Sequence, residues 1–366
     1  MIYTYDRNNR TFAYIQLYGQ LKRDIVQGLY PYGQKLPSKR ALAQESPFSM
    51  ITIEHAYSLL LEEGFVESKE KSGYYVIYRS SDFSGHTGSV PVEAENRPSQ
   101  ARIPEKDAVV FSFSVLARTV RRVLLDYAEE LLVKPPNSGC EFFRDEISRY
   151  LARSRGLKVH RDQIVIGAGA EYLYGLIGQL FREEKQIAVE DPSYDKIRSV
   201  YQALGLACDL LKLGGDGIRS AELARTKARI LHVTPFHSYP SHVTASVSKK
   251  KEYLRWARER QGYLIEDNYD SELTISRKAE DSLFAMSDGD RVIYINTFSK
   301  TIAPALRVGY MILPVSLSEP FCRSLGFYSC TVPVLDQCVL TELLRTGDYE
   351  RHINRVRRAR RKQLNS

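Results

Sequence analysis

Short apolar runs alternate with helical segments over residues 109–366, and this alternation constrains the fold more than any other feature of the chain. The runs are IVIGAG, QIAVED, RILHVTP, GYLIEDN, RVIYINT and VGYMIL. Such alternation is typical of an α/β domain in which helices cover a largely parallel sheet. Ligands of these domains bind at the carboxyl ends of the strands, so the residues that follow each run are candidates for a functional site.

The first 78 residues have a different pattern. One amphipathic helix is predicted from residues that are apolar at helical spacing: Ile15, Leu17, Leu21, Ile25 and Leu29. A second helix runs through KRALAQES and ends at Pro47, and a third extends from Ser49 to Glu63, before Gly64. The segment FVESKEKSGYYVI alternates around a turn, which predicts a hairpin. Three helices and a hairpin predict a winged helix, whose third helix can enter a DNA major groove.

A segment rich in Ser, Gly, Pro and charge, residues 80–108, separates the two patterns. This composition predicts a linker. The expected domains are therefore a winged helix-turn-helix over residues 1–78, a linker over 79–108 and an α/β domain over 109–366. A chain of 366 residues has room for two such domains.

The composition predicts a soluble, cytoplasmic protein. No apolar run approaches the ~20 residues of a membrane helix, and the N-terminus has no secretory pattern. Five widely spread cysteines without a CxxC pair argue against disulfides and against a metal site. The formal net charge is +8, and residues 351–366, RHINRVRRARRKQLNS, hold six Arg, one Lys and no acid, or +7. This tail is interpreted as a helix face whose acidic partners lie elsewhere in the fold.

Two strand ends in the α/β domain carry residues suited to a ligand. Gly167, Gly169 and Ala170 follow IVI and begin a helix whose N–H groups can bind a phosphate, although a tight strand-to-helix turn needs the same residues. Asp267 and Tyr269 follow GYLI, and a carboxylate and a phenol there could hold a heteroaromatic ring. Taken alone, a surface acid is the simpler interpretation of Asp267.

The stretch NTFSKTIAPALRVGY supplies a third strand end. Thr297 and Ser299 offer hydroxyls, and Arg307 offers a planar fork suited to phosphate. Lys300 offers an amine that forms a Schiff base with an aldehyde. A ligand with an aldehyde, a pyridine nitrogen, a phenolic oxygen and a phosphate is pyridoxal 5′-phosphate. The three strand ends together predict this cofactor.

Residues 12–77, from YIQLYGQLKRDIVQGLYPYGQKLPSKRALAQES to the hairpin, resemble the GntR-type winged helix-turn-helix. The resemblance implies DNA-binding roles for Lys39 and Arg40 at the backbone, and for Ser49, Thr52 and His55 as base and phosphate readers on the recognition helix. Two positions depart from the family pattern. Pro47 stands where Gly is usual, and Met50 stands where Arg is usual.

Residues 109–366 resemble the fold type I aminotransferase domain, and a GntR-type head joined to such a domain is the pattern of MocR/GabR-type transcriptional regulators. The matching stretches are IVIGAGAEYLYGL, VEDPSYDKIR, VTPFHSYPSHVTAS, LIEDNYDSEL, NTFSKTIAPALRVGY and GDYERHINRVRRARR. The resemblance implies that Lys300 holds pyridoxal 5′-phosphate as a Schiff base, that Asp267 partners the pyridinium and Tyr269 the ring oxygen, and that Tyr194 stacks on the ring. The implied phosphate-binding residues are Gly169, Ala170, Thr297, Ser299 and Arg307.

Three departures from the family pattern concern the α/β domain. The family's HQYP(S/T)G reads HSYPSH here, with Ser238 for Gln and His242 for Gly. A phosphate-binding tyrosine of the family has no counterpart in KPPNSG. Family members also continue past RRARRKQLNS, so an incomplete small domain without the family's carboxylate-binding arginine is expected.

The expected function is that of a homodimeric transcriptional regulator that binds an operator of two half-sites. Its aminotransferase-like domain would sense an amine or amino acid effector, and neither a metal nor a membrane takes part. Two alternatives remain open, because a fold alone does not decide a function. One is an aminotransferase with an accessory DNA-binding head, and the other is a truncated DNA-binding dimer without a working cofactor switch.

Overall fold

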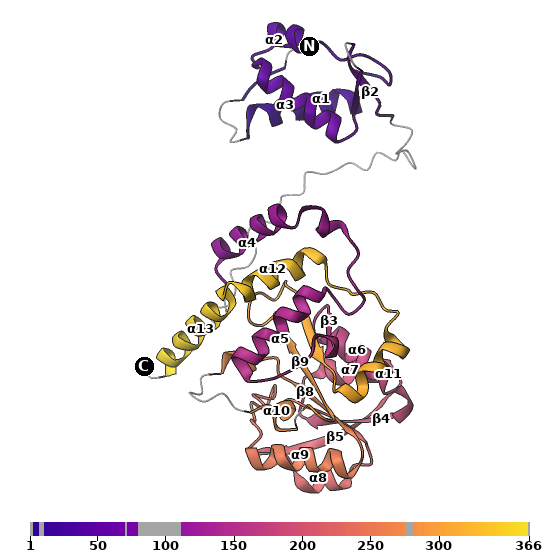
Figure 1. The fold of residues 1–366 in the computed structure, drawn as a ribbon, viewed down its shortest axis with the longest axis vertical. Helices are drawn as coiled ribbons and strands as arrows, with labels where there is room; N and C mark the ends of the chain where they lie inside the picture. The colour runs from indigo at the N-terminus through magenta and orange to yellow at the C-terminus, as the bar shows by residue number, and fades with distance from the viewer. Residues whose placement is uncertain are drawn as a thin grey trace. The chain divides into compact units, whose positions relative to one another are not determined.

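The computed structural model describes residues 3–6, 11–69, 72–79, 111–274, 281–287 and 289–364. The chain forms two compact units, Met1–Arg102 and Ile103–Ser366 (Figure 1). The boundary between the units falls inside the predicted linker, 79–108, of which only Arg79 is among the described residues. The middle of the predicted hairpin turn, 70–71, and the last two residues of the basic tail also lie outside them.

The first unit is a winged helix-turn-helix, as predicted. Helices α1 (Ala13–Val26), α2 (Lys39–Glu45) and α3 (Met50–Glu62) precede an antiparallel hairpin of β1 (Val66–Lys69) and β2 (Gly73–Val76). Ser38 and Ser49 cap α2 and α3, because their hydroxyls accept hydrogen bonds from N–H groups in the first turn of each helix. Gly64, with a φ of 73°, lets the chain turn from α3 into the hairpin.

A small hydrophobic core holds the first unit together. Leu17, Leu21 and Ile25 of α1 are buried in it with Ile53 and Leu60 of α3. The predicted first helix extends to Leu29, whereas α1 ends at Val26 and Leu29 is exposed. Gly28 causes the early end, since its φ of 78° is left-handed.

The second unit is an α/β domain around a mixed, mainly parallel sheet. Its described part forms eight strands in the order β3-β10-β9-β8-β7-β4-β5-β6. The strands from β9 across to β5 are parallel, β10 is antiparallel to both β3 and β9, and β6 is antiparallel to β5. The bounds are β3 (Ile164–Gly167), β4 (Gln186–Asp191), β5 (Ala207–Gly214), β6 (Gly217–Ile218), β7 (Ile230–Val233), β8 (Tyr263–Asp267), β9 (Val292–Thr297) and β10 (Gly309–Ile312).

Each of the six predicted apolar runs forms one of these strands. Strands β5 and β6 were not predicted from the sequence. β5 is near the sheet edge and only Leu211 among its residues is buried, so its sequence lacks a continuous apolar run.

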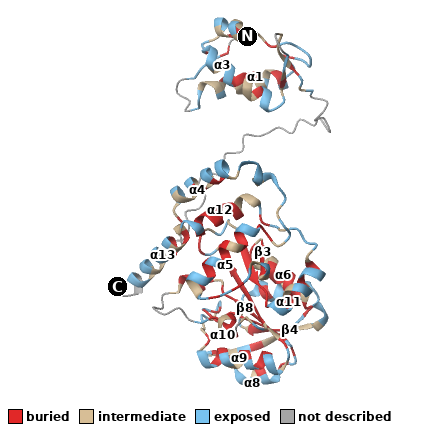
Figure 2. Ribbon diagram, viewed as in Figure 1, coloured by how far each residue is buried: buried red, intermediate tan, exposed pale blue. Residues whose placement is uncertain are grey.

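Helices cover both faces of the sheet (Figure 1). Because successive strand residues point to opposite faces, each strand contributes to two cores. Ile166 and Tyr294 belong to the hydrophobic core on one face of the sheet, whereas Val165 and Ile295 belong to the core on the other face. Figure 2 shows the strands as a buried layer. The helices are α4 (Phe113–Asp126), α5 (Glu141–Arg155), α6 (Ala170–Leu180), α7 (Asp195–Ala203), α8 (Ser220–Arg225), α9 (Val247–Glu259), α10 (Leu283–Met286), α11 (Val315–Leu325), α12 (Val334–Arg345) and α13 (Asp348–Leu364).

The basic tail forms α13, and part of its charge is engaged by the turn that follows β8. Arg357 Nε donates a hydrogen bond of 2.7 Å to the carbonyl oxygen of Glu272, and its Nη2 lies 3.7 Å from the Glu272 carboxylate. Arg360 donates to the carbonyl oxygen of Leu273 at 3.3 Å. These two arginines have their partners in another segment, as the sequence pattern indicated, whereas Arg355 and Arg358 are exposed.

Candidate functional site

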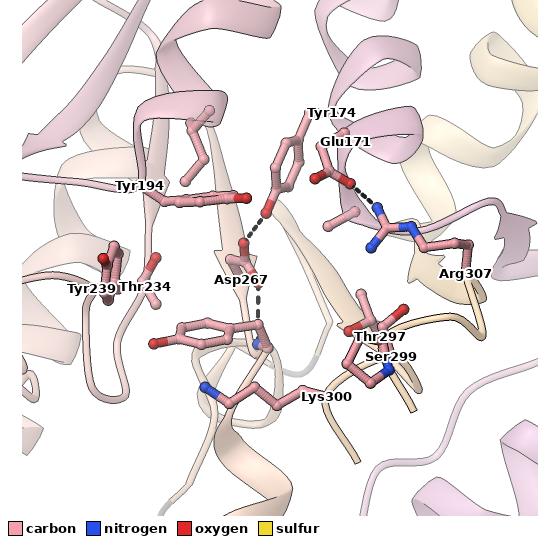
Figure 3. Close-up of a pocket in the computed structure, with 14 residues that line it drawn as sticks. Glu171, Tyr174, Tyr194, Thr234, Tyr239, Asp267, Thr297, Ser299, Lys300 and Arg307 are labelled. Atoms are coloured by element: carbon pink, nitrogen blue, oxygen red, sulfur yellow. Dashed lines mark hydrogen bonds and ion pairs between the residues drawn. The ribbon is translucent and has the colours of Figure 1, made fainter. Parts of the chain in front are cut away.

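The carboxyl ends of five strands meet around a pocket of about 360 Å³ (Figure 3). Eight of the nine predicted cofactor residues line it, and the ninth, Gly169, adjoins the lining residue Ala170. The lining residues are Ala170, Glu171, Tyr174, Tyr194, Ile197, Thr234, Tyr239, Asp267, Tyr269, Thr297, Ser299, Lys300, Pro304 and Arg307. The structure therefore brings together residues that lie up to about 140 positions apart in the chain, as expected for a site at the strand ends.

Asp267 ends β8 and is almost completely buried. Its Oδ1 accepts a hydrogen bond of 3.1 Å from the Tyr269 N–H, and its Oδ2 accepts a close hydrogen bond from the Tyr174 hydroxyl. Burial and the neighbouring Asp267 carboxylate raise the pKa of Tyr174, which keeps this phenol a donor. The simpler interpretation of Asp267 as a surface acid is wrong, because the carboxylate is fixed inside the fold.

Lys300 follows β9 and projects into the pocket (Figure 3). Its Nζ lies 3.7 Å from Asp270 Oδ1 and 4.8 Å from the centre of the Tyr269 ring. The side chain is 43% exposed, so a small molecule can reach its amine from solvent. Asp270 and the Tyr269 ring are thus the charged and the aromatic neighbour of this amine.

Arg307 lies against the start of α6, where Gly169 makes room for it. A Cβ added to Gly169 would be 2.8 Å from Arg307 Nη2, and the φ of Gly169 is 85°. The guanidinium also forms a close ion pair with Glu171. Ser299, predicted to offer its hydroxyl to phosphate, instead donates it to the carbonyl oxygen of Leu306 at 2.7 Å.

The two predicted aromatic residues border the pocket in different ways. Tyr194 stands after β4 and forms an edge contact with Tyr239, with ring centres 6.3 Å apart. The Tyr269 hydroxyl donates to the carbonyl oxygen of His237 at 2.9 Å, and burial raises the pKa of this phenol. His242, which replaces the glycine of the family pattern, has a φ of 57° and so occupies the left-handed conformation that glycine suits best.

Glu171, Tyr174 and Tyr239 line the pocket but were missed in the sequence. Glu171 and Tyr174 belong to the first turn and a half of α6, and Tyr174 stands four residues after Ala170. Residues at this spacing share one face of a helix, so the pattern AEYLY contained a usable signal. Tyr239 lies in a loop, where no periodicity marks it.

A buried carboxyl group outside the pocket lining belongs to Glu190. Glu190 of β4 accepts a hydrogen bond of 2.5 Å from the Ser238 hydroxyl. Burial raises the pKa of Glu190 to about 8, and the Ser238 hydrogen bond opposes this shift. Ser238, at a position where the family pattern has Gln, therefore supplies a donor that this carboxyl group needs.

The free energy of unfolding of the second unit is expected to fall as the pH rises from about 4.5 to about 8, because the folded chain keeps a proton on Glu190 that the unfolded chain releases. Glu190→Gln should flatten this profile and raise stability at pH 8 by roughly 1–3 kcal/mol. Urea unfolding followed by Trp256, the one tryptophan in the sequence, measures it. Exposed Glu183→Gln is the control. An unchanged slope in Glu190→Gln would assign the pH dependence elsewhere.

The predicted DNA-binding residues of the first unit differ in their exposure and in whether another side chain already pairs with them. Arg40 and His55 are exposed, and the His55 ring contacts the edge of Tyr14. Lys39 is paired with Glu54 at 2.6 Å. Ser49 and Thr52 bond to each other through their hydroxyls at 2.9 Å, because Ser49 caps α3. Met50, at a position where the family pattern has Arg, exposes 43% of its surface on the first turn of α3.

Comparison with known proteins identifies both units. Residues 13–76 match the model of the bacterial regulatory proteins of the gntR family, and residues 114–340 match aminotransferase class I and II. The HTH-type transcriptional regulator YdeL of Bacillus subtilis (strain 168) is 33% identical over 365 residues, which cover 97% of this chain and 79% of YdeL. The chain belongs to this family of HTH-type transcriptional regulators. The probable rhizopine catabolism regulatory protein MocR of Rhizobium meliloti is 25% identical to this regulator, over 96% of the chain and 76% of MocR.

Solved structures support the fold of the regulator's second unit. An archaeal alanine:glyoxylate aminotransferase superposes with a TM-score of 0.61 and 22% identity, over 66% of the regulator and 62% of the enzyme. In the part of the regulator that the structure describes, no helix has both the length and the apolarity to cross a membrane. No cluster of potential metal ligands occurs among the described residues either.

Proposed function

We propose that this regulator binds double-stranded DNA through its winged helix and pyridoxal 5′-phosphate through the pocket of its second unit. The observation that carries the proposal is the placement of Lys300, Asp267 and Arg307 around one pocket in a chain that also carries a gntR-type unit. Aminotransferases of class I and II depend on pyridoxal 5′-phosphate, and regulators of the gntR family bind DNA.

The residues that line the pocket fit the cofactor. Lys300 offers an amine for its aldehyde, buried Asp267 offers a negative charge for its pyridine nitrogen, and Arg307 beside the start of α6 offers donors for its phosphate. Gly169 leaves the space that a side chain would fill at this helix start. When bound, the cofactor supplies a carbonyl carbon that reacts with amines.

The surrounding residues fix the geometry of these three groups. Tyr174 and the Tyr269 N–H hold both oxygens of Asp267, so the carboxylate points in one direction without further ordering. Lys300 is open to solvent and can be approached by an amine or amino acid effector. An effector that competes for the position of the Lys300 amine would release this side chain toward Asp270, which lies within ion-pair distance.

A homodimer is part of the proposal, because two winged helices can read the two half-sites of an operator. Phe113 and Leu125 of α4 and Leu132 beyond it are each at least 80% exposed. Apolar side chains this exposed favour burial against a second copy of the chain. Sedimentation of the full chain measures the expected dimer, and Leu125→Glu should shift it toward monomer.

Arg40→Ala tests the proposed DNA contact. We expect roughly five- to tenfold weaker binding to a mixed-sequence duplex, and a slope of log affinity against log salt that is smaller by about 0.9, because one phosphate contact is lost. Fluorescence anisotropy of labelled duplex with the full chain at several salt concentrations measures both quantities.

The matched control is Arg323→Ala, which removes the same charge from an exposed position in the second unit. It should leave the affinity and the salt slope as in the parent. Equal slopes for Arg40→Ala and the parent would show that Arg40 does not contact a phosphate.

A further inference from the structure

The guanidinium of Arg307 is already engaged by an acid that lines the same pocket. Arg307 Nη2 donates a close charged hydrogen bond to Glu171 Oε2, and Lys196 Nζ lies 3.0 Å from Glu171 Oε1. Glu171 is in the first turn of α6, next to Ala170. One carboxylate thus bridges two cations at the end of the pocket where a phosphate is expected.

Glu171 is held in its charged form. Burial alone would raise the pKa of this side chain, but the hydrogen bond from Lys196 and the charge of Arg307 outweigh burial and lower it. The side chain of Glu171 is 26% exposed and that of Arg307 is 51% exposed, so both are within reach of a ligand. A phosphate that contacts Arg307 would therefore come close to a full negative charge.

Arg307 contacts Glu171 and the start of α6 at the same time. The guanidinium lies against Gly169, whose missing side chain allows this contact. A phosphate bound by the N–H groups at the start of α6 would contact Arg307. It would then lie close to the Glu171 carboxylate, which is on the first turn of the same helix. Like charges at such short range repel, and water screens them only in part.

We propose that Glu171 competes with phosphate for Arg307 and so weakens the binding of phosphorylated ligands. This inference rests on the proposed cofactor pocket and adds that its occupancy is reversible. A regulator whose pocket releases pyridoxal 5′-phosphate can respond to the concentration of this ligand, whereas a permanently loaded pocket cannot.

Glu171→Gln tests the competition, with exposed Glu183→Gln as the control for the same change in net charge. The full chain is titrated calorimetrically with pyridoxal 5′-phosphate, pyridoxal and inorganic phosphate. The three affinities separate the contribution of the phosphate from that of the ring. We expect Glu171→Gln to bind pyridoxal 5′-phosphate and inorganic phosphate about tenfold more tightly than the parent, a change that corresponds to ~1.4 kcal/mol. Its affinity for pyridoxal, and all affinities of Glu183→Gln, should match the parent. Glu171→Ala, which removes the carboxylate without adding an amide, should reproduce the tighter binding.

Unchanged or weaker phosphate binding in both Glu171 variants would overturn the inference, since it would mean that Glu171 orients Arg307 for phosphate. The proposed cofactor role fails in a different way. The cofactor role is contradicted if the parent protein gains no visible absorbance band when pyridoxal 5′-phosphate is added. This result would hold whatever the affinity of Glu171→Gln for phosphate.

Discussion

Lys300→Ala is expected to abolish the covalent attachment of pyridoxal 5′-phosphate. Among the described residues that line the pocket, Lys300 is the sole lysine, and an alanine cannot react with an aldehyde. The parent should gain a visible absorbance band, and borohydride reduction should add the cofactor mass to the peptide that contains residue 300. The variant should show neither change, and any cofactor that it binds through Arg307 should be lost on dialysis.

Lys251→Ala is the matched control, because Lys251 is an exposed lysine of α9. It should behave as the parent in both measurements. A band of equal strength in Lys300→Ala would place the reactive amine elsewhere. A thermal melt of each variant confirms that a lost band does not reflect unfolding.

Glu272→Gln is expected to reduce the free energy of unfolding of the second unit by about 3–5 kcal/mol, because it leaves a buried arginine charge without its partner. Arg155 Nη2 lies 3.3 Å from Glu272 Oε1, and the two side chains are only 9% and 3% exposed. Arg357 of α13 loses its carboxylate partner in the same variant. Urea unfolding followed by the emission of Trp256 reports on this unit, since Trp256 is buried in α9.

Glu319→Gln provides the comparison, because it breaks a pair with Arg323 whose side chains are 79% and 77% exposed. An exposed pair contributes less than about 1 kcal/mol, since water solvates both charges after the change. If Glu272→Gln and Glu319→Gln lose the same free energy of unfolding, water or another group must solvate the Arg155 charge when residue 272 is neutral.

The elements of the fold that the sequence predicts are those marked by residues within the element itself. The helices and hairpin of the first unit were predicted, except for the end of the first helix, since Ser49, Pro47 and Gly64 mark helix ends through their own backbone and capping preferences. Strands β3, β4 and β7 to β10 are buried and carry apolar runs. β5 has little burial to mark it, and its pairing with β4 depends on tertiary contact that no local pattern records.

The pocket was predictable where a residue type is tied to one chemistry. Lys300, Asp267 and Arg307 each stand at a strand end and each carry a charge that a cofactor can use. Among their partners, Glu171 and Tyr174 were marked only by the helical spacing of AEYLY, whereas Asp270 acquires its role from a distance set by folding. The winged helix gave a similar result, since the pairing of Lys39 with Glu54 joins two helices.

The hydrogen bonds from Arg357 and Arg360 to the carbonyl oxygens of Glu272 and Leu273 tie α13 to the turn after β8. The same turn carries Tyr269, which lines the pocket, and Asp270, which lies within ion-pair distance of Lys300. Coupling between two such regions is reciprocal. A ligand that orders this turn would therefore also order the first contacts of α13, and a change in the position of α13 would move two residues beside Lys300.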